Sequence, residues 1–286
     1  MENKLVRKAR KIFYSNKKRI YQSIKVNKAQ QRILFIVGCQ RSGTTMMLHV
    51  FEGDLNTQCF AERSKLTSND TARGIRLNSL DLIKRDLSKI RAPFIVIKPL
   101  VESQNTPKLL DYFNNSQAVW MYRNYKDVAL SNIKQFGIQS GLSNLRPIIN
   151  NETNNWRAEI VSEHVRETIS RHFSEDMNPY DAAALFWFAR NSLYFDLNLD
   201  EDPRVMLCRY EDFVVEPEKH MRAIYQQVGQ VYPATGIASI VHSNSIKKGK
   251  DIEFSPQVEQ IVQDLQNKLE VVYQDKIRQQ QELFSA

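Results

Sequence analysis

The fold of this chain is decided by residues 33–48, ILFIVGCQRSGTTMML. The stretch begins with an uninterrupted apolar run, which is typical of a strand buried in a parallel sheet. A short turn of small and polar residues follows, and the apolar pattern that resumes at Met46 favours the start of a helix. A strand that enters a helix through such a turn directs backbone N–H groups at one point, where the helix dipole also favours an anion. The stretch therefore predicts a phosphate-binding loop.

The loop differs at one position from that of the nucleoside triphosphatases, whose pattern is G-x-x-x-x-G-K-[ST]. Gly38 and Gly43 have the required separation, but Thr44 stands where the lysine should be, and the basic residue is Arg41. The loop therefore predicts a bound anion without identifying it. A kinase or ATPase with a degenerate loop stays open on this pattern alone.

The composition indicates one large folded domain. The chain has 286 residues, of which 42% are hydrophobic and 25% are charged, and a core of this size needs no disulfide bonds. The three cysteines, Cys39, Cys59 and Cys208, form no C-x-x-C pair, so a reducing compartment is the simpler interpretation. Because there is neither a signal-peptide pattern nor an apolar run near the roughly 18 residues that span a bilayer, we expect a cytoplasmic protein.

The basic character of the chain is concentrated at its N-terminus. Residues 1–32 hold 11 of the 40 Lys and Arg residues but only Glu2 of the 32 acidic residues, so the remainder is close to neutral. Within residues 1–30 the apolar side chains recur at roughly helical spacing. These residues predict a basic N-terminal helical segment, which is either a leader helix packed loosely on the domain or an arm for an anionic membrane surface.

From residue 31 onward the pattern alternates between strands and helices. Short apolar runs predict strands at residues 33–37, 94–98, 117–122 and 204–208. Helical patterns predict helices at residues 44–53, 78–90, 106–114, 125–135, 181–198, 217–228 and 255–280. We therefore expect residues 31–286 to form one α/β domain, a central parallel sheet flanked by helices in a three-layer architecture like that of the P-loop nucleoside triphosphatases. Residues 137–180, which show no strand pattern, are expected to form a substrate cap.

A second anion-binding pair is indicated by residues 120–131, WMYRNYKDVALS. Arg123 falls at the predicted end of a strand, and Ser131 lies two helical turns further along. Ligands of open α/β sheets bind at the carboxyl ends of strands. A guanidinium and a hydroxyl there are suited to a second phosphate, each charge-assisted hydrogen bond contributing roughly 1.5–3 kcal/mol. Pairing of Arg123 with a neighbouring carboxylate is the alternative.

Two further segments carry charged residues. Residues 209–218, RYEDFVVEPE, are typical of a strand end, a turn and a new helix, and their carboxylates are suited to orienting basic side chains. Residues 246–250, IKKGK, place cations around a glycine, a pattern found both in anion-binding loops and in exposed basic loops. Neither segment identifies a ligand by itself.

Together these segments resemble the sulfotransferases that use 3′-phosphoadenosine-5′-phosphosulfate (PAPS). The resemblance extends from Ile33 to about Leu269 and is strongest at the Arg-Ser-Gly-Thr-Thr loop and at Arg123 with Ser131. It implies that the first loop holds the 5′-phosphosulfate, that Arg123 and Ser131 hold the 3′-phosphate, and that a late loop covers the same phosphate. The positions that it assigns to PAPS binding are Arg41, Ser42, Gly43, Thr44, Thr45, Arg123, Ser131, Lys247, Lys248 and Gly249.

The resemblance also implies catalytic residues. In the family a lysine near the end of the second predicted strand lies beside the bridging oxygen, which assigns Lys98 to leaving-group stabilisation. The histidine that many cytosolic members use as general base is missing, since Leu100 stands at its position. Other members use a glutamate, and Glu62 lies in a segment that resembles theirs. We predict Glu62 as the base, with Glu102 and His49 as alternatives.

The predicted function is in-line transfer of a sulfuryl group from PAPS to an acceptor hydroxyl, with release of 3′,5′-adenosine bisphosphate. Arg41, the cation of the loop, is assigned to catalysis as well as to binding. We expect a carbohydrate, a lipid-linked glycan or a small metabolite as acceptor, and neither a metal nor a nucleic acid as partner. A P-loop kinase or ATPase and a catalytically inactive nucleotide-binding homologue are the alternatives.

A group of aromatic and basic residues lies inside the predicted cap. One interpretation places them in an acceptor pocket for an anionic or sugar substrate, and the other places them on a solvated helix face. The residues are Trp156, Arg157, Arg166 and Arg171. The sequence leaves both interpretations open.

Overall fold

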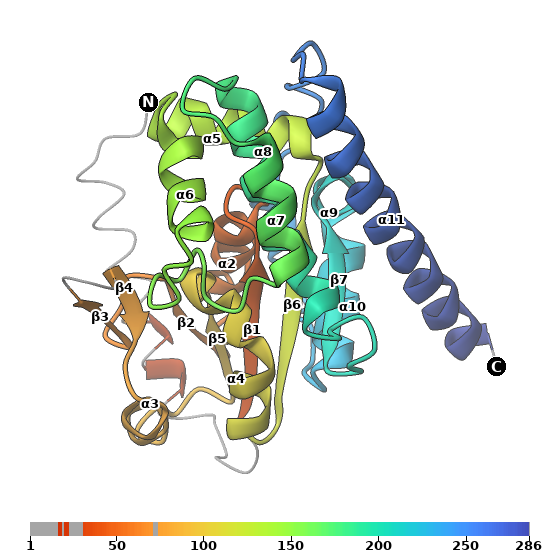
Figure 1. Ribbon diagram of the computed structural model, residues 1–286. Helices are drawn as coiled ribbons and strands as arrows, with labels where there is room; N and C mark the ends of the chain where they lie inside the picture. The colour runs from red at the N-terminus through yellow and green to blue at the C-terminus, as the bar shows by residue number, and fades with distance from the viewer. Residues whose placement is uncertain (1–16, 19, 23–30, 71–73, 286) are drawn as a thin grey trace, which may run out of the picture.

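A parallel sheet of five strands forms the centre of the molecule, in the order β2-β5-β1-β6-β7 (Figure 1). The computed structural model describes residues 17–18, 20–22, 31–70 and 74–285. All four predicted strands are confirmed to within one residue at each end, and the structure adds β2, a polar edge strand that no apolar run announced. The strands are β1 (Arg32–Gly38), β2 (Thr57–Phe60), β5 (Phe94–Ile97), β6 (Ser116–Tyr122) and β7 (Val205–Arg209).

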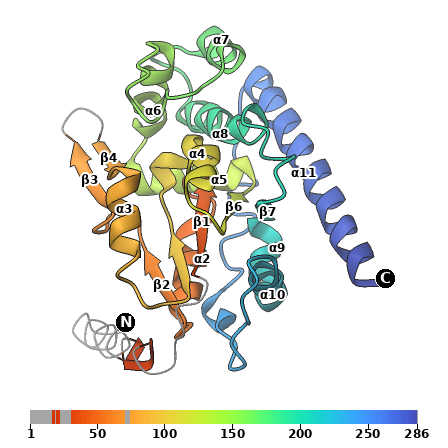
Figure 2. The same cartoon turned by 90° about the horizontal axis from the view of Figure 1, so that it is seen from below.

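Strand β1 lies in the middle of the sheet, and all of its residues after Arg32 are buried. Since side chains alternate along a strand, Leu34 and Ile36 enter the core on one face, while Phe35 and Val37 enter the core on the other. Both cores are closed by helices (Figure 2). The expected three-layer α/β architecture is therefore confirmed.

The helices divide between the two faces. On the face of Leu34, the sheet packs against α2 (Thr44–Glu52), α9 (Tyr210–Val215) and α10 (Pro217–Gln227). The face of Phe35 packs against α3 (Leu80–Leu87), α4 (Thr106–Tyr112), α5 (Tyr125–Phe136), α8 (Pro179–Asp196) and α11 (Pro256–Ser285). The seven predicted helices are all present, with shifted ends, and α9 is an additional short helix.

Two insertions lie beyond this sheet. The first is an antiparallel hairpin, β3 (Thr67–Asp70) and β4 (Gly74–Leu77), which the sequence did not predict because its strands have four residues each and no continuous apolar run. The second is the segment expected to form a cap, which contains α6 (Ser140–Ile149) and α7 (Glu163–His172) and no strand. Both helices pack near α8 at one end of the molecule (Figure 1).

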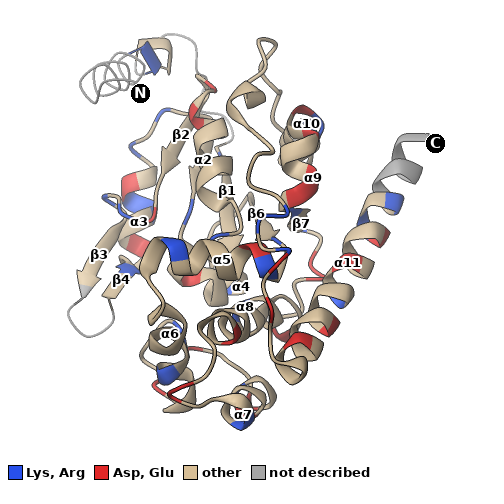
Figure 3. Ribbon diagram, turned by 90° about the horizontal axis from the view of Figure 1, so that it is seen from above, with Lys and Arg blue, Asp and Glu red and all other residues tan. Residues whose placement is uncertain are grey.

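Most of the basic N-terminal segment lies outside the described residues, so its predicted membrane arm stays a prediction, as does the cytoplasmic location. Of the described part, Lys18 donates to Thr57 Oγ1 (3.1 Å) and Gln22 donates to the Leu55 carbonyl (2.9 Å), which fixes both residues at the start of β2. Within the described ranges, no helix has the length and apolar character required to span a membrane. Lys and Arg residues are interspersed with Asp and Glu along helices such as α3 and α11 (Figure 3), in keeping with the near-neutral remainder of the chain.

Candidate active site

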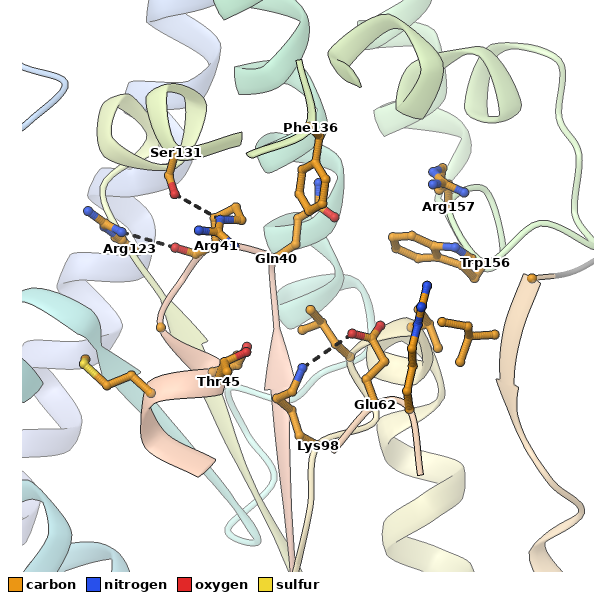
Figure 4. A pocket seen from close by; sticks show the side chains of 18 of the residues that line it. Gln40, Arg41, Thr45, Glu62, Lys98, Arg123, Ser131, Phe136, Trp156 and Arg157 are labelled. Atoms are coloured by element: carbon orange, nitrogen blue, oxygen red, sulfur yellow. Dashed lines mark hydrogen bonds and ion pairs between the residues drawn. The ribbon is translucent and has the colours of Figure 1, made fainter. Parts of the chain in front are cut away.

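The loops at the carboxyl ends of the strands enclose a cavity of about 760 Å³ (Figure 4). This is the edge at which open α/β sheets bind their ligands. The cavity is lined by residues of the loops that follow the strands and by residues of the two insertions. They include Arg41, Thr44, Thr45, Glu62, Arg63, Lys98, Arg123, Ser131, Phe136, Trp156, Arg157, Tyr210 and Ser245.

The phosphate-binding loop has the backbone that its two glycines predict. Gly38 has φ of 123° and Gly43 has φ of 90°, and a Cβ on Gly38 would lie 2.3 Å from the Met121 carbonyl oxygen. Helix α2 follows without a side-chain cap, so its first N–H groups are left for a ligand. Arg41 is the loop's other residue with positive φ (67°), a strained conformation of the kind that concentrates at binding sites.

Replacing Gly43 with alanine is expected to damage this loop. The new Cβ would lie 2.3 Å from Tyr210 Cδ2 in a conformation that L residues rarely adopt, so we expect a loss of about 1–3 kcal/mol in the free energy of unfolding. Urea denaturation measures this loss. Gly137 is a matched control, because it has φ of 88° but open space around its Cβ position. Equal losses in the two alanine variants would contradict a steric role for Gly43.

The loop's residues take different positions. Gly43, Thr44 and Thr45 line the cavity, whereas Ser42 is fully buried beneath it. No described group bonds the Ser42 hydroxyl. Because a buried polar atom without a partner is costly, the Ser42 hydroxyl and the uncapped helix both fit an external anionic group at this point. The predicted contacts of these residues with PAPS stay predictions.

Arg123 and Ser131 lie together at one end of the cavity, with Arg41 between them (Figure 4). Arg123 is 6% exposed, donates to the Arg41 carbonyl oxygen (3.3 Å) and lies over the Tyr210 ring at 4.4 Å. Arg41 Nε donates to Ser131 Oγ (3.0 Å). The structure therefore places the Arg41 guanidinium beside the predicted 3′-phosphate site, and its predicted catalytic role stays a prediction.

Positive charge accumulates at this end of the cavity. Burial lowers the pKa of Arg41, and the neighbouring guanidinium of Arg123 lowers it further. Arg123 forms the ion pair with a neighbouring carboxylate that was its alternative role, since Asp127 lies 3.4 Å away. Asp127 also accepts two backbone N–H groups, and Arg123 Nε has no partner among the described residues. Two crowded guanidiniums and a free donor are suited to a doubly charged phosphate.

The loop of residues 246–250 contacts the site through its backbone and not through its lysine side chains. The N–H groups of Lys247 and Gly249 each donate to the Asp127 carboxylate at 2.8 Å, and a Cβ on Gly249 would lie 2.3 Å from the Lys126 carbonyl oxygen. Lys247 and Lys248 are exposed, and neither lines the cavity. Ser245 does line it, and its carbonyl oxygen accepts from Arg123. The sequence missed Ser245, which belongs to no recognisable motif, and the contact of Asp127 with the late loop.

Glu62 and Lys98 meet in the middle of the cavity (Figure 4). Lys98 Nζ lies 3.5 Å from Glu62 Oε2, and the lysine is 5% exposed. The two residues are neighbours because β2 and β5 pair in parallel with Phe60 opposite Ile97, and each residue follows the end of its strand. A carboxylate and an ammonium side by side are suited to accepting and donating a proton or hydrogen bond at adjacent points.

Of the three candidate bases, Glu62 alone lines the cavity. Both oxygens of Glu102 are engaged, with Arg76 Nε at 2.7 Å and Asn105 Nδ2 at 2.8 Å among their donors. His49 is exposed in the last turn of α2. The geometry therefore favours Glu62.

The far end of the cavity is formed by the two insertions. Gly74 and Ile75 come from the hairpin, while Trp156 and Arg157 come from the loop between α6 and α7. Figure 4 shows the latter pair across the cavity from Arg123. The other two basic residues of the predicted cluster, Arg166 and Arg171, lie on α7 and pair there with acidic neighbours, outside the cavity.

A family model for the sulfotransferase domain matches residues 31–278. Among solved structures, the sulfotransferase domain from the curacin biosynthetic pathway is 16% identical, with a TM-score of 0.54 over 82% of this chain and 98% of that one. The sulfotransferase domain from the Synechococcus PCC 7002 olefin synthase is 14% identical, with a TM-score of 0.50 over 84% of this chain and 97% of that one. At these identities the structures share the fold. No curated protein sequence gave a match.

Proposed function

The chain belongs to the sulfotransferase domain family, whose members transfer a sulfuryl group from PAPS, and we propose that it acts on a hydroxyl group activated by Glu62. The observation that carries this proposal is the Glu62–Lys98 pair, 3.5 Å apart, in the same cavity as the phosphate-binding loop. When bound, PAPS supplies the sulfur atom, whose bond to a phosphate oxygen breaks as its bond to the acceptor oxygen forms.

The chain's own groups divide this work along the cavity. Arg123, Ser131 and Arg41 would hold the 3′-phosphate, since they form the positively charged end. The backbone of Gly43, Thr44 and Thr45 would hold the 5′-phosphosulfate at the start of α2. The backbone of residues 247–249 closes the same end through Asp127.

Glu62 is proposed to act on the oxygen that attacks sulfur, and Lys98 is proposed to act on the oxygen that leaves it. The Glu62 carboxylate accepts the proton of the acceptor hydroxyl as the oxygen attacks sulfur. The Lys98 ammonium donates a hydrogen bond to the leaving phosphate oxygen, where negative charge accumulates. Residues 137–180 supply part of the acceptor side through Trp156 and Arg157, which supports the proposed cap. A carbohydrate, a lipid-linked glycan and a small hydroxylated metabolite are the proposed acceptor classes.

The test is transfer of ³⁵S from labelled PAPS to acceptors in a cell extract, combined with calorimetry of nucleotide binding. We expect labelled product and tighter binding of 3′,5′-adenosine bisphosphate than of ADP with Mg²⁺. Preference for ADP with Mg²⁺ would indicate a kinase or ATPase. Tight bisphosphate binding with no labelled product would indicate an inactive nucleotide-binding homologue.

Arg123 is expected to set the preference for the 3′-phosphate. In Arg123→Gln, the affinity ratio of 3′,5′-adenosine bisphosphate to 5′-AMP should fall by about 10- to 150-fold, the equivalent of one charge-assisted hydrogen bond of roughly 1.5–3 kcal/mol. Calorimetry with both nucleotides measures the ratio, which is insensitive to a general loss of fold. Arg123→Lys should keep part of the preference, and Arg171→Gln, on exposed α7, should keep all of it. An unchanged ratio in Arg123→Gln would contradict the assignment.

A further inference from the structure

The acceptor end of the cavity contains two basic residues that the transfer reaction does not use. Figure 4 shows Glu62 and Lys98 between Arg123 on one side and Trp156 with Arg157 on the other. An acceptor whose hydroxyl reaches Glu62 therefore extends toward Arg157. Arg63, which follows Glu62 in the chain, also lines the cavity.

Arg157 is half-buried and has no acidic partner among the described residues. Its Nε donates to Asn144 Oδ1 (2.6 Å), and its guanidinium lies 4.6 Å from the centre of the Trp156 ring. Burial lowers the pKa of Arg157. By contrast, Arg76 pairs with both Glu102 and Glu159. A partly buried charge without a counter-charge is unfavourable, so its retention at the rim of a cavity points to an anionic ligand.

The loop that carries Arg157 is held rigidly. The Trp156 carbonyl oxygen accepts from Arg190 (3.2 Å), a fully buried arginine of α8. Two residues beyond Arg157, Glu159 Oε2 accepts from Gln104 (2.8 Å) and from Arg76 (2.8 Å). These bonds tie the loop to α8 and to the residues after β5. Arg157 is therefore presented to the cavity by a fixed support, which is what selective recognition requires.

Arg63 is a second cation of the cavity without a carboxylate partner among the described residues. Arg41 and Arg123 lie at the 3′-phosphate end, and Lys98 lies beside Glu62, the carboxylate of the cavity. Arg63 and Arg157 also line the cavity, and no hydrogen bond or ion pair joins Arg63 to the described part of the chain.

We infer that the acceptor is itself acidic: besides the hydroxyl that receives the sulfuryl group, it carries a carboxylate, phosphate or sulfate that the Arg157 guanidinium binds. The inference rests on the proposed function and narrows its acceptor class. A bidentate contact from a planar guanidinium suits each of these anions. Arg63 contributes a second positive charge to the same cavity.

The experiment separates acidic from neutral acceptors before the reaction. An extract of cells that naturally contain this protein is divided by anion exchange into a neutral and an acidic pool of small molecules and glycans. Each pool is then incubated with the full chain and ³⁵S-labelled PAPS. Label should enter the acidic pool. Loss of labelling after treatment of that pool with phosphatase identifies the acidic group as a phosphate. Loss of labelling after methyl esterification identifies it as a carboxylate, and labelling that persists through both treatments identifies it as a sulfate.

Arg157→Gln tests the residue. For the acidic pool we expect the apparent KM to rise by about 10- to 150-fold with little change in kcat, because the lost contact binds the acceptor away from the reacting atoms. Affinity for 3′,5′-adenosine bisphosphate should stay unchanged, which also checks the fold. Arg157→Lys keeps the charge and should recover part of the loss, and Arg171→Gln is the matched control.

Three outcomes would count against the inference or its premise. Label confined to the neutral pool, or an unchanged KM in Arg157→Gln, would overturn the acidic acceptor. Label in neither pool, with tight binding of the bisphosphate, would instead contradict the transferase activity on which the inference rests.

Discussion

Replacing Glu62 with glutamine is expected to lower the turnover number by about 10²- to 10⁴-fold, the contribution typical of a general base. Glutamine keeps the size of the side chain but cannot accept the acceptor's proton. Binding of 3′,5′-adenosine bisphosphate should be unchanged, because Glu62 lies away from the Arg123 end of the cavity (Figure 4). Initial rates of ³⁵S transfer and calorimetry measure the two quantities.

The pH profile gives an independent check on the same residue. In the native enzyme, kcat/KM should fall as acid protonates the base, and Glu62→Gln should lack this acidic limb. Glu102→Gln is an informative comparison, because its carboxylate is occupied by Arg76, Asn105 and the Leu77 N–H. That variant should lose stability but keep the acidic limb. A normal turnover number in Glu62→Gln would remove Glu62 as the base.

The sequence predicted the parts of the fold that have strong local signals. Strands β1, β5, β6 and β7 are apolar runs because helices cover both faces of the sheet. Strand β2 and the hairpin were missed, since TQCF, TSND and GIRL carry mostly polar or small residues. Their pairing depends on neighbours distant in the sequence, which short-range patterns do not report.

In the candidate site, too, the sequence predicted the contacts between residues close in the chain and missed those between distant ones. Arg123 and Ser131 lie near each other because a strand end and the following helix are joined locally. The contact of Asp127 with Gly249 spans 122 positions, and no motif announces it. The Glu62–Lys98 pair depends on β2, so the resemblance to a family suggested both residues, while only the register of β2 and β5 explains their contact.

The sequence did not reveal the surroundings of Arg41, and it left the role of Arg157 undecided. The place of Arg41 in the loop did not reveal its bond to Ser131, which brings its guanidinium beside Arg123 and Ser131, and its predicted contact with the phosphosulfate stays a prediction. Arg157 and Arg171 looked equivalent as basic residues of one cap. The structure separates them, since Arg157 faces the cavity and Arg171 pairs with Glu167 on an exposed helix.

The second large effect is expected at Lys98. Lys98→Met should lower the turnover number by about 10²- to 10³-fold, the cost typical of removing one preorganised donor from a developing negative charge. Methionine has a similar length and is readily buried, and Lys98 is only 5% exposed, so the fold should tolerate the change. Rates of ³⁵S transfer under saturating PAPS measure the loss.

The pH profile distinguishes a leaving-group role for Lys98 from support of Glu62. If Lys98 stabilises the leaving oxygen, Lys98→Met keeps the acidic limb that depends on Glu62, and its loss lies in kcat rather than in KM. Lys98→Arg retains a cation beside Glu62 and should recover part of the rate. Disappearance of the acidic limb in Lys98→Met would show that the lysine acts by holding the carboxylate, 3.5 Å away, in its working position. Turnover near the native value would remove Lys98 from the mechanism, because a donor beside the breaking bond binds the leaving oxygen more strongly as negative charge develops there in the transition state.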